Sequence, residues 1–163
     1  MTDRESQKPK TSVKAAALRL LSFRARSERE LTDRLKEKSF DISEIRSTVD
    51  SLISSGLIND EEFARSVAAS RVRNKFWGSK KIAYDLTKKG IARELINKAI
   101  SEVSAGGEEA TARKALGKWL RFSGLKMPLK EKNRDRGMRH LASKGFPSSV
   151  IFRVIDDIID DDI

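Results

Sequence analysis

Apolar and polar positions follow one pattern that occurs three times along this chain. Each copy contains a phrase of Leu, two mostly polar residues, Lys, Ser or Gly, and a large apolar residue: LKEKSF (35–40), LTKKGI (86–91) and LASKGF (141–146). Further apolar residues follow in step, with Ile45, Ile96 and Ile151 ten positions after the leucines and Val49, Ile100 and Ile155 fourteen after them. A period near fifty residues is typical of a repeat architecture.

The spacing within each copy predicts three helices. In the first copy, Ser27 followed by Glu30 is a capping box that opens the second helix. Asp41, with Glu44 three positions on, caps the third helix, whose expected buried stripe is Ile42, Ile45, Val49 and Leu52. We therefore expect an all-α fold, an elongated array of three tandem three-helix repeats. Their ranges are 11–56, 57–105 and 106–156, between a polar head (1–10) and an acidic tail (157–163).

The recurrent phrase itself predicts a bend between the second and third helix of each repeat. Its Lys lies in the last helical turn, where a cation suits the negative end of the helix dipole. Gly90 and Gly145 can adopt the left-handed conformation that ends a helix, which Ser39 adopts less readily. The apolar residue that follows then packs back across the bend.

Composition excludes several classes of protein. There is no Cys and one His, so neither a disulfide nor a zinc site of the usual kind can form. GSKK (78–81) lacks the earlier Gly and the adjacent Lys of a phosphate loop. No stretch is apolar enough to span a membrane, and the first residues do not resemble a signal peptide. We expect a cytoplasmic protein that is not an enzyme and uses no cofactor or metal, in which His140 is a surface or interhelical residue.

Charge indicates a polyanionic partner. The chain has 34 Lys and Arg against 24 Asp and Glu, a net charge of +10. Five Asp lie in the last eight residues, DDIIDDDI, so the rest carries 34 basic and 19 acidic groups, a net of +15. The tail is either a solubilising end or a competitor with nucleic acid for Arg134, Arg136 and Arg139. A basic body of this kind favours nucleic acid or an acidic protein surface over a merely solvated face.

The basic residues gather in two places. Residues 71–89, RVRNKFWGSKKIAYDLTKK, hold seven Lys and Arg, one Asp, and three interleaved aromatic residues. Cations and aromatics together are what phosphate contact and base stacking require, although Phe76 and Trp77 also fit the core at a helix corner. Residues 113–139 hold ten Lys and Arg against Glu131 and Asp135. Like charges at helical spacing repel one another, so a partner is favoured here too.

Four stretches together resemble the bacterial RecX family, which regulates the RecA recombinase. They are LRLLSFRARSERELTDRL (18–35), LINDEEFARSVAASRV (57–72), GSKKIAYDLTKKGI (78–91) and LASKGFPSSVI (141–151). The head and the acidic tail do not match the family pattern. The resemblance implies a non-enzymatic monomer that lies along the RecA–DNA filament, where it inhibits ATP hydrolysis, strand exchange and coprotease activity. It also implies weaker binding to single- and double-stranded DNA alone, and no membrane partner.

The family offers no catalytic motif to transfer, so the candidate filament contacts rest on local charge. They are Arg24, Arg26, Arg71, Arg73, Lys75, Trp77, Lys80, Lys81, Lys88, Lys89, Arg134, Arg136 and Arg139.

The main alternative is a tandem helix-turn-helix protein that binds duplex DNA directly. Such a protein needs Arg, Asn or Gln on the helix that enters the groove. The third helices here carry Glu44, Arg46, Glu94 and Asn97, and the last of them is acidic, which is poor chemistry for reading bases.

The linear array has a testable consequence in solution. A compact globule of this length has a radius of gyration of about 15 Å. Repeats arranged in a row give a clearly larger value, above roughly 19 Å. Small-angle X-ray scattering measures this radius directly, and a value near that of the globule contradicts the linear arrangement.

Overall fold

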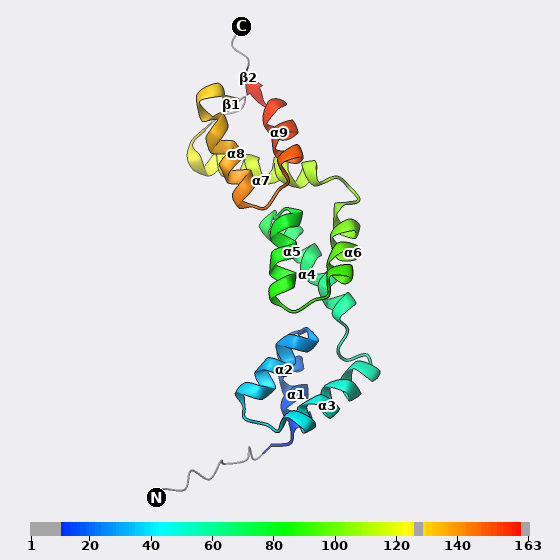
Figure 1. Cartoon of the computed structure of the whole chain (residues 1–163). Helices are drawn as coiled ribbons and strands as arrows, with labels where there is room; N and C mark the ends of the chain where they lie inside the picture. Colours follow the sequence, from blue (N-terminus) through cyan, green and yellow to red (C-terminus); the bar gives the residue numbers. More distant parts are fainter. Residues whose placement is uncertain (1–10, 126–128, 161–163) are drawn as a thin grey trace, which may run out of the picture. The chain divides into compact units, whose positions relative to one another are not determined.

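The described part of the chain, residues 11–125 and 129–160 of this computed structural model, is almost entirely helical (Figure 1). The first repeat contains α1 (Val13–Phe23), α2 (Glu28–Glu37) and α3 (Ile42–Ser54), and the second contains α4 (Asp60–Lys75), α5 (Ser79–Lys88) and α6 (Arg93–Ser104). The third contains α7 (Glu108–Ser123), α8 (Arg134–Ser143) and α9 (Ser148–Asp156). A 3-10 helix, Glu131–Asn133, precedes α8, and two-residue strands β1 (Leu129–Lys130) and β2 (Ile159–Asp160) pair in parallel. The predicted all-α array of tandem three-helix repeats is confirmed. The sequence also predicts a helix break at Pro128, a position that lies outside the described residues.

The chain forms two compact units. Unit 1 comprises the described residues up to Phe63 together with the turn Lys89–Ile91. Unit 2 comprises Ala64–Lys88 and the described residues from Ala92 onward.

The helix starts follow the cap chemistry expected from the sequence. The Ser27 hydroxyl accepts a hydrogen bond from the Glu30 amide, and the Glu30 side chain accepts one from the Ser27 amide, which completes the capping box. Asp41 accepts hydrogen bonds from the amides of Ser43 and Glu44 at the start of α3. Each cap satisfies amides that the first helical turn leaves without a partner.

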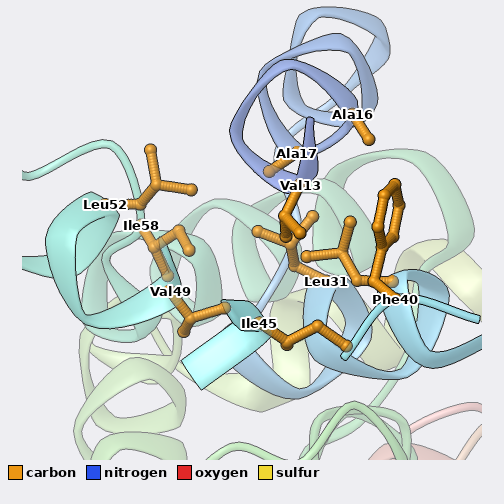
Figure 2. Packing of buried hydrophobic residues seen from close by; sticks show 10 residues of the cluster. Val13, Ala16, Ala17, Leu31, Phe40, Ile45, Val49, Leu52 and Ile58 are labelled. Carbon is orange, nitrogen blue, oxygen red and sulfur yellow. The ribbon is translucent and has the colours of Figure 1, made fainter. Parts of the chain in front are cut away.

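The core of unit 1 is built from side chains of its three helices together with Phe40, which follows α2, and Ile58, which follows α3 (Figure 2). Leu31 and Leu35 of α2 are fully buried, and Ile45 and Val49 of α3 are nearly so. Burying a side chain of this size stabilises the fold by about 1.5–3 kcal/mol. Ile42 was predicted to belong to this stripe and does not, since it is 70% exposed. It is the first residue of α3, and helical side chains tilt toward the N-terminus, so its side chain extends past the packed part of the helix.

Unit 2 contains a second core formed by α7, α8 and α9. Leu116, Leu141, Phe146 and Ile155 lie in this cluster and are almost completely buried. His140 of α8 stacks on Trp119 of α7, with ring centroids 5.2 Å apart, so the expected interhelical position of this His is confirmed.

The recurrent phrase forms the predicted bend in all three repeats. Ser39, Gly90 and Gly145 have φ values of +60°, +80° and +85°. The apolar residues after them, Phe40, Ile91 and Phe146, are buried. Ser39 therefore adopts the left-handed conformation as the two glycines do.

Two of these bends also share one kind of partner, the beginning of a second helix. In unit 1, the Ser27 hydroxyl donates to the Lys89 carbonyl at 2.6 Å. In unit 2, the Gly78 amide donates to the Lys144 carbonyl at 2.9 Å, and the Lys80 amide donates to the Gly145 carbonyl at 3.0 Å. Ser27 and Gly78 both precede the second helix of their repeat, at α2 and α5 respectively. The bend is therefore also a docking element.

The close approach at Gly78 predicts a steric cost that any side chain would incur. An added Cβ there would lie 2.6 Å from backbone atoms of Gly145 and Phe146, which cannot rotate away. We expect Gly78→Ala to destabilise the protein by about 1–3 kcal/mol, as overpacking does. Gly117→Ala in α7 is the control: a Cβ meets nothing within 4 Å there, so the better helix former should stabilise by about 0.5–1 kcal/mol. Urea unfolding followed by circular dichroism measures both, and equal effects would show that the contact does not restrict residue 78.

Candidate nucleic-acid interface

Trp77 lies at the centre of the basic stretch 71–89, in the corner between α4 and α5. The Arg71 guanidinium carbon lies 5.0 Å from the centre of the Trp77 ring, and the Lys81 ammonium lies 4.9 Å from it. A cation held over an indole ring is attracted by the negative face of the π-system. The ring is half-buried and already contacts two cations, so it is poorly placed to stack on a nucleic-acid base. Its neighbour Phe76 packs against the core of α7, α8 and α9.

The remaining cations of this stretch are mostly exposed. Asp85, its one acidic residue, pairs with Arg71 at 2.8 Å, and Lys89 pairs with Glu30 outside the stretch. Arg73, Lys75, Lys80 and Lys88 are exposed, and within the described ranges none of them has a carboxylate in ion-pair distance. Lys88 lies over the exposed Tyr84 ring at 5.1 Å. These side chains give unit 2 a surface that attracts an anion.

Three other sequence candidates make contacts inside unit 1. Glu30 pairs with Arg24 at 2.9 Å and with Lys89 at 3.1 Å. Burial alone would raise the pKa of Glu30, but hydrogen bonds and charges from Arg24 and Lys89 outweigh it and hold that pKa at about 2. Arg26 donates to the Leu20 carbonyl, and burial lowers its pKa. These contacts give the three cations a structural role.

The arginines of the third repeat also have partners. Arg134 pairs with Asp156 at 3.0 Å, while Arg136 donates to the Asn133 side chain and Arg139 to the Asp135 carbonyl. Arg113 pairs with Asp157. Asp156 and Asp157, the first two residues of DDIIDDDI, thus pair with basic side chains of the same unit. Such pairing is what we expect if the tail competes with nucleic acid for Arg134.

The structure places two sequence candidates, Lys75 and Lys81, near two lysines that sequence inspection did not single out, Lys118 and Lys144. Lys144 ends α8, and its ammonium donates to the Lys75 carbonyl at 3.2 Å. Burial lowers the pKa of Lys144, as do the charges of Lys81, Lys118 and Lys75, in that order. We call these four residues the lysine cluster. Lys118 and Lys144 were not among the sequence candidates because nothing in linear order brings α7 and the end of α8 to the α4–α5 corner.

The described residues were also compared with the requirements of a metal site and of a membrane span. No group of three or more His, Asp or Glu residues within 11–125 and 129–160 is arranged to hold a metal ion. In those same ranges, no helix has the length and apolar character needed to cross a bilayer. What the arrangement provides is an array of ammonium and guanidinium groups on a helical scaffold.

The fold and this surface define an all-α tandem-repeat protein with a strongly cationic face. Comparison with known sequences then shows that the chain belongs to the RecX family. Residues 14–52 match the first three-helix domain of RecX, and residues 59–100 match the second.

Individual relatives agree over most of the chain. The protein named Regulatory protein RecX from Corynebacterium efficiens is 31% identical over 99% of this chain and 78% of its own length. Its namesake from Chromobacterium violaceum is 33% identical over 93% of both chains. The crystal structure of RecX from Lactobacillus salivarius superimposes with a TM-score of 0.77 at 25% identity, covering 89% of this chain and 93% of that one.

The depressed pKa of Glu30 predicts a pH-dependent contribution to stability. A carboxylate whose pKa is lowered by folding stabilises the protein above its unfolded pKa and loses that contribution as the pH falls through its folded pKa. For Glu30 the window runs from about pH 4.5 down to about pH 2. We expect Glu30→Gln to lower the melting temperature at pH 7, with the difference from the parent protein shrinking across this window.

Glu37→Gln is the control, because Glu37 pairs with Arg34 on the exposed surface of α2. Exposed pairs contribute about 0–1 kcal/mol, so this change should have little effect at any pH. Differential scanning calorimetry across the pH series measures both variants. A constant difference between Glu30→Gln and the parent protein would contradict the role given to the charge.

Proposed function

We propose that this chain binds the filament of RecA on DNA and modulates it, mainly by inhibiting ATP hydrolysis, strand exchange and coprotease activity. The chain belongs to a family whose members are named regulatory proteins, which supports this proposal. The sequence of the chain also contains no recognised catalytic motif. In this proposal the protein acts in the cytoplasm, as a monomer, by occupying a surface.

The observation that carries the proposal is the uncompensated charge of the exposed cations along α4 and α5. Arg73, Lys80 and Lys88 project from unit 2 with no carboxylate paired to them among the described residues. Each cation that neutralises a phosphate releases condensed counterions, which favours binding and makes it sensitive to salt. A filament that carries DNA is a partner of matching charge.

The test removes exposed cations that form no ion pair among the described residues. In the variant Arg73→Ala/Lys80→Ala/Lys88→Ala, Arg71 and Lys81 remain over Trp77, so the corner keeps its packing. We expect its affinity for RecA–DNA filaments to fall about tenfold or more, with the salt dependence reduced by up to about 0.9 in slope for each lost phosphate contact. Inhibition of RecA ATP hydrolysis should fall in parallel.

A matched variant distinguishes a local surface from net charge. Arg19→Ala/Lys36→Ala/Arg46→Ala removes the same number of exposed cations from unit 1. It should inhibit RecA nearly as well as the parent protein. If the first variant also inhibits fully, the contact surface lies elsewhere. If both variants bind naked duplex DNA as tightly as they bind the filament, the alternative function is favoured, which is direct DNA binding by a helix-turn-helix protein.

A further inference from the structure

An open groove lies in unit 1, between α1 and the bend that follows α2. Its volume is about 580 Å³, within the range of ~300–1,000 Å³ that ligand sites occupy. Two of its lining residues are cations, Arg19 and Lys38, both exposed and, among the described residues, without an ion pair. The other side chains used below are apolar: Ala16, Leu20 and Phe23 of α1, and Phe40 of the bend.

The third repeat contains the same set of positions. At the spacing of Ala16, Arg19, Leu20 and Phe23 in α1, the sequence of α7 has Ala115, Lys118, Trp119 and Phe122. In the recurrent phrase, Lys144 and Phe146 are the equivalents of Lys38 and Phe40. Ala16 and Ala115 are both buried, as are Phe40 and Phe146, which supports the correspondence. The chain therefore contains a second version of this groove, with which the first can be compared.

In the third repeat, the end of α4 fills the equivalent place. Phe76, which directly follows α4, packs against the core of α7, α8 and α9, and the Lys118 ammonium lies 5.7 Å from the centre of its ring. The Lys144 ammonium donates to the carbonyl of Lys75, the last residue of α4, at 3.2 Å. One cation thus contacts the aromatic ring and the other contacts the helix end.

The chemistry of this contact explains why both cations are needed. The last carbonyls of a helix lack intrahelical partners and carry the negative end of the helix dipole, so an ammonium donor suits them. A second cation attracts the negative face of the ring. Arg19 and Lys38 offer the same two groups in the first repeat, and a guanidinium also stacks on aromatic faces. The open groove therefore matches a helix end followed by an aromatic side chain.

We propose that the groove between α1 and the first bend binds the C-terminal end of a helix of another protein, with an aromatic residue directly after that helix. Residues 1–10 precede Thr11, which also lines the groove, but they include no aromatic residue and cannot supply the ring. A second copy of the chain is the other source, since Phe122 in the last turn of α7 is 82% exposed. The monomer of the proposed function favours a different protein.

This inference is independent of the proposed filament function. The groove contains none of the cations of α4 and α5 to which filament binding is assigned, and its partner is a protein other than the RecA filament. The charge control that replaces Arg19 therefore keeps its meaning in the filament test. Neither RecA nor DNA is present in the experiment below, so the groove and the filament surface can fail separately.

The probe is the peptide EAAAKEAAANKFG with blocked ends, in which NKF copies residues 74–76 and the preceding repeats favour a helix. Two-dimensional NMR of the full chain labelled with ¹⁵N follows its binding. We expect saturable shifts of the amides of residues 16–23 and 38–40. The peptide EAAAKEAAANKAG, which lacks the ring, should bind about tenfold more weakly or less, because burial of the aromatic side chain drives binding.

The informative variant is Arg19→Met/Lys38→Met, which removes both cations and retains unbranched apolar side chains. We expect it to bind the phenylalanine peptide about tenfold more weakly. Lys14→Met/Lys36→Met is the matched control, because it removes the same charge from exposed positions of α1 and α2 that do not line the groove. It should bind as the parent protein does. If the double variant fails to fold, Arg19→Met alone should still weaken binding about threefold.

Four results would overturn the proposal. Equal affinity for the two peptides would show that the ring is not recognised, and an equal loss in the control would show that net charge alone attracts the peptide. Shifts confined to unit 2 would place the binding surface elsewhere. Finally, sedimentation velocity may be run on the parent protein and on Phe122→Ser. Self-association that this substitution abolishes would assign the groove to a second copy of the chain.

Discussion

The structure depends on the hydrogen bond between the bend of one repeat and the start of a second helix. The carbonyl of Lys89 or Lys144, at the end of a helix, would otherwise lack an intrahelical partner. In unit 1 it is satisfied by the Ser27 hydroxyl, and in unit 2 by the Gly78 amide. Ser27 is completely buried and at the same time caps α2, so one hydroxyl serves two polar groups. A helix end is thus completed by a neighbouring helix start, which makes each contact specific in register.

Charge at this contact has a different role in each unit. Where Glu30 faces Lys89, the pair is half-buried and contributes to stability. Where Lys81 faces Lys144, no stabilising pair exists and the cations remain available to an external anion. One backbone geometry therefore supports both a structural ion pair and a cationic surface. The backbone hydrogen bonds hold the fold in place, which leaves the side chains free to vary.

Much of the fold could be predicted because its determinants are local. The capping box at Ser27, the cap at Asp41 and the bends of the phrase each depend on residues within a few positions of one another. Ile42 was misassigned because helical spacing says which face a residue occupies and not how far the packed region extends. The pairing of β1 with β2 was not foreseen, since two residues carry no periodicity.

The candidate site was less accessible from the sequence, because its charges are sorted by tertiary contacts. Arg71, Lys81 and Lys89 read as equivalent cations in linear order. In the structure, Arg71 contacts Asp85 and Trp77, and Lys81 contacts Trp77 and a backbone carbonyl. Lys89 pairs with Glu30. Among the Lys and Arg residues of the basic stretch 71–89, only Arg73, Lys75, Lys80 and Lys88 are exposed. Counting charge located the region, while separating structural from available cations required the packing of α4, α5 and α8.

The glycines of the recurrent phrase show that the residue type at a bend depends on which other segments pack against it. Positive φ alone does not demand glycine here, since Ser39 and Phe76 adopt it at +60° and +51°. Gly145 differs because a Cβ would collide with the backbone of Lys81. Ser39 is exposed, and within the described residues its bend makes no backbone hydrogen bond to the start of another helix. Glycine therefore occurs in this phrase where another segment packs against the bend, and the side chain of Ser39 is tolerated where none does.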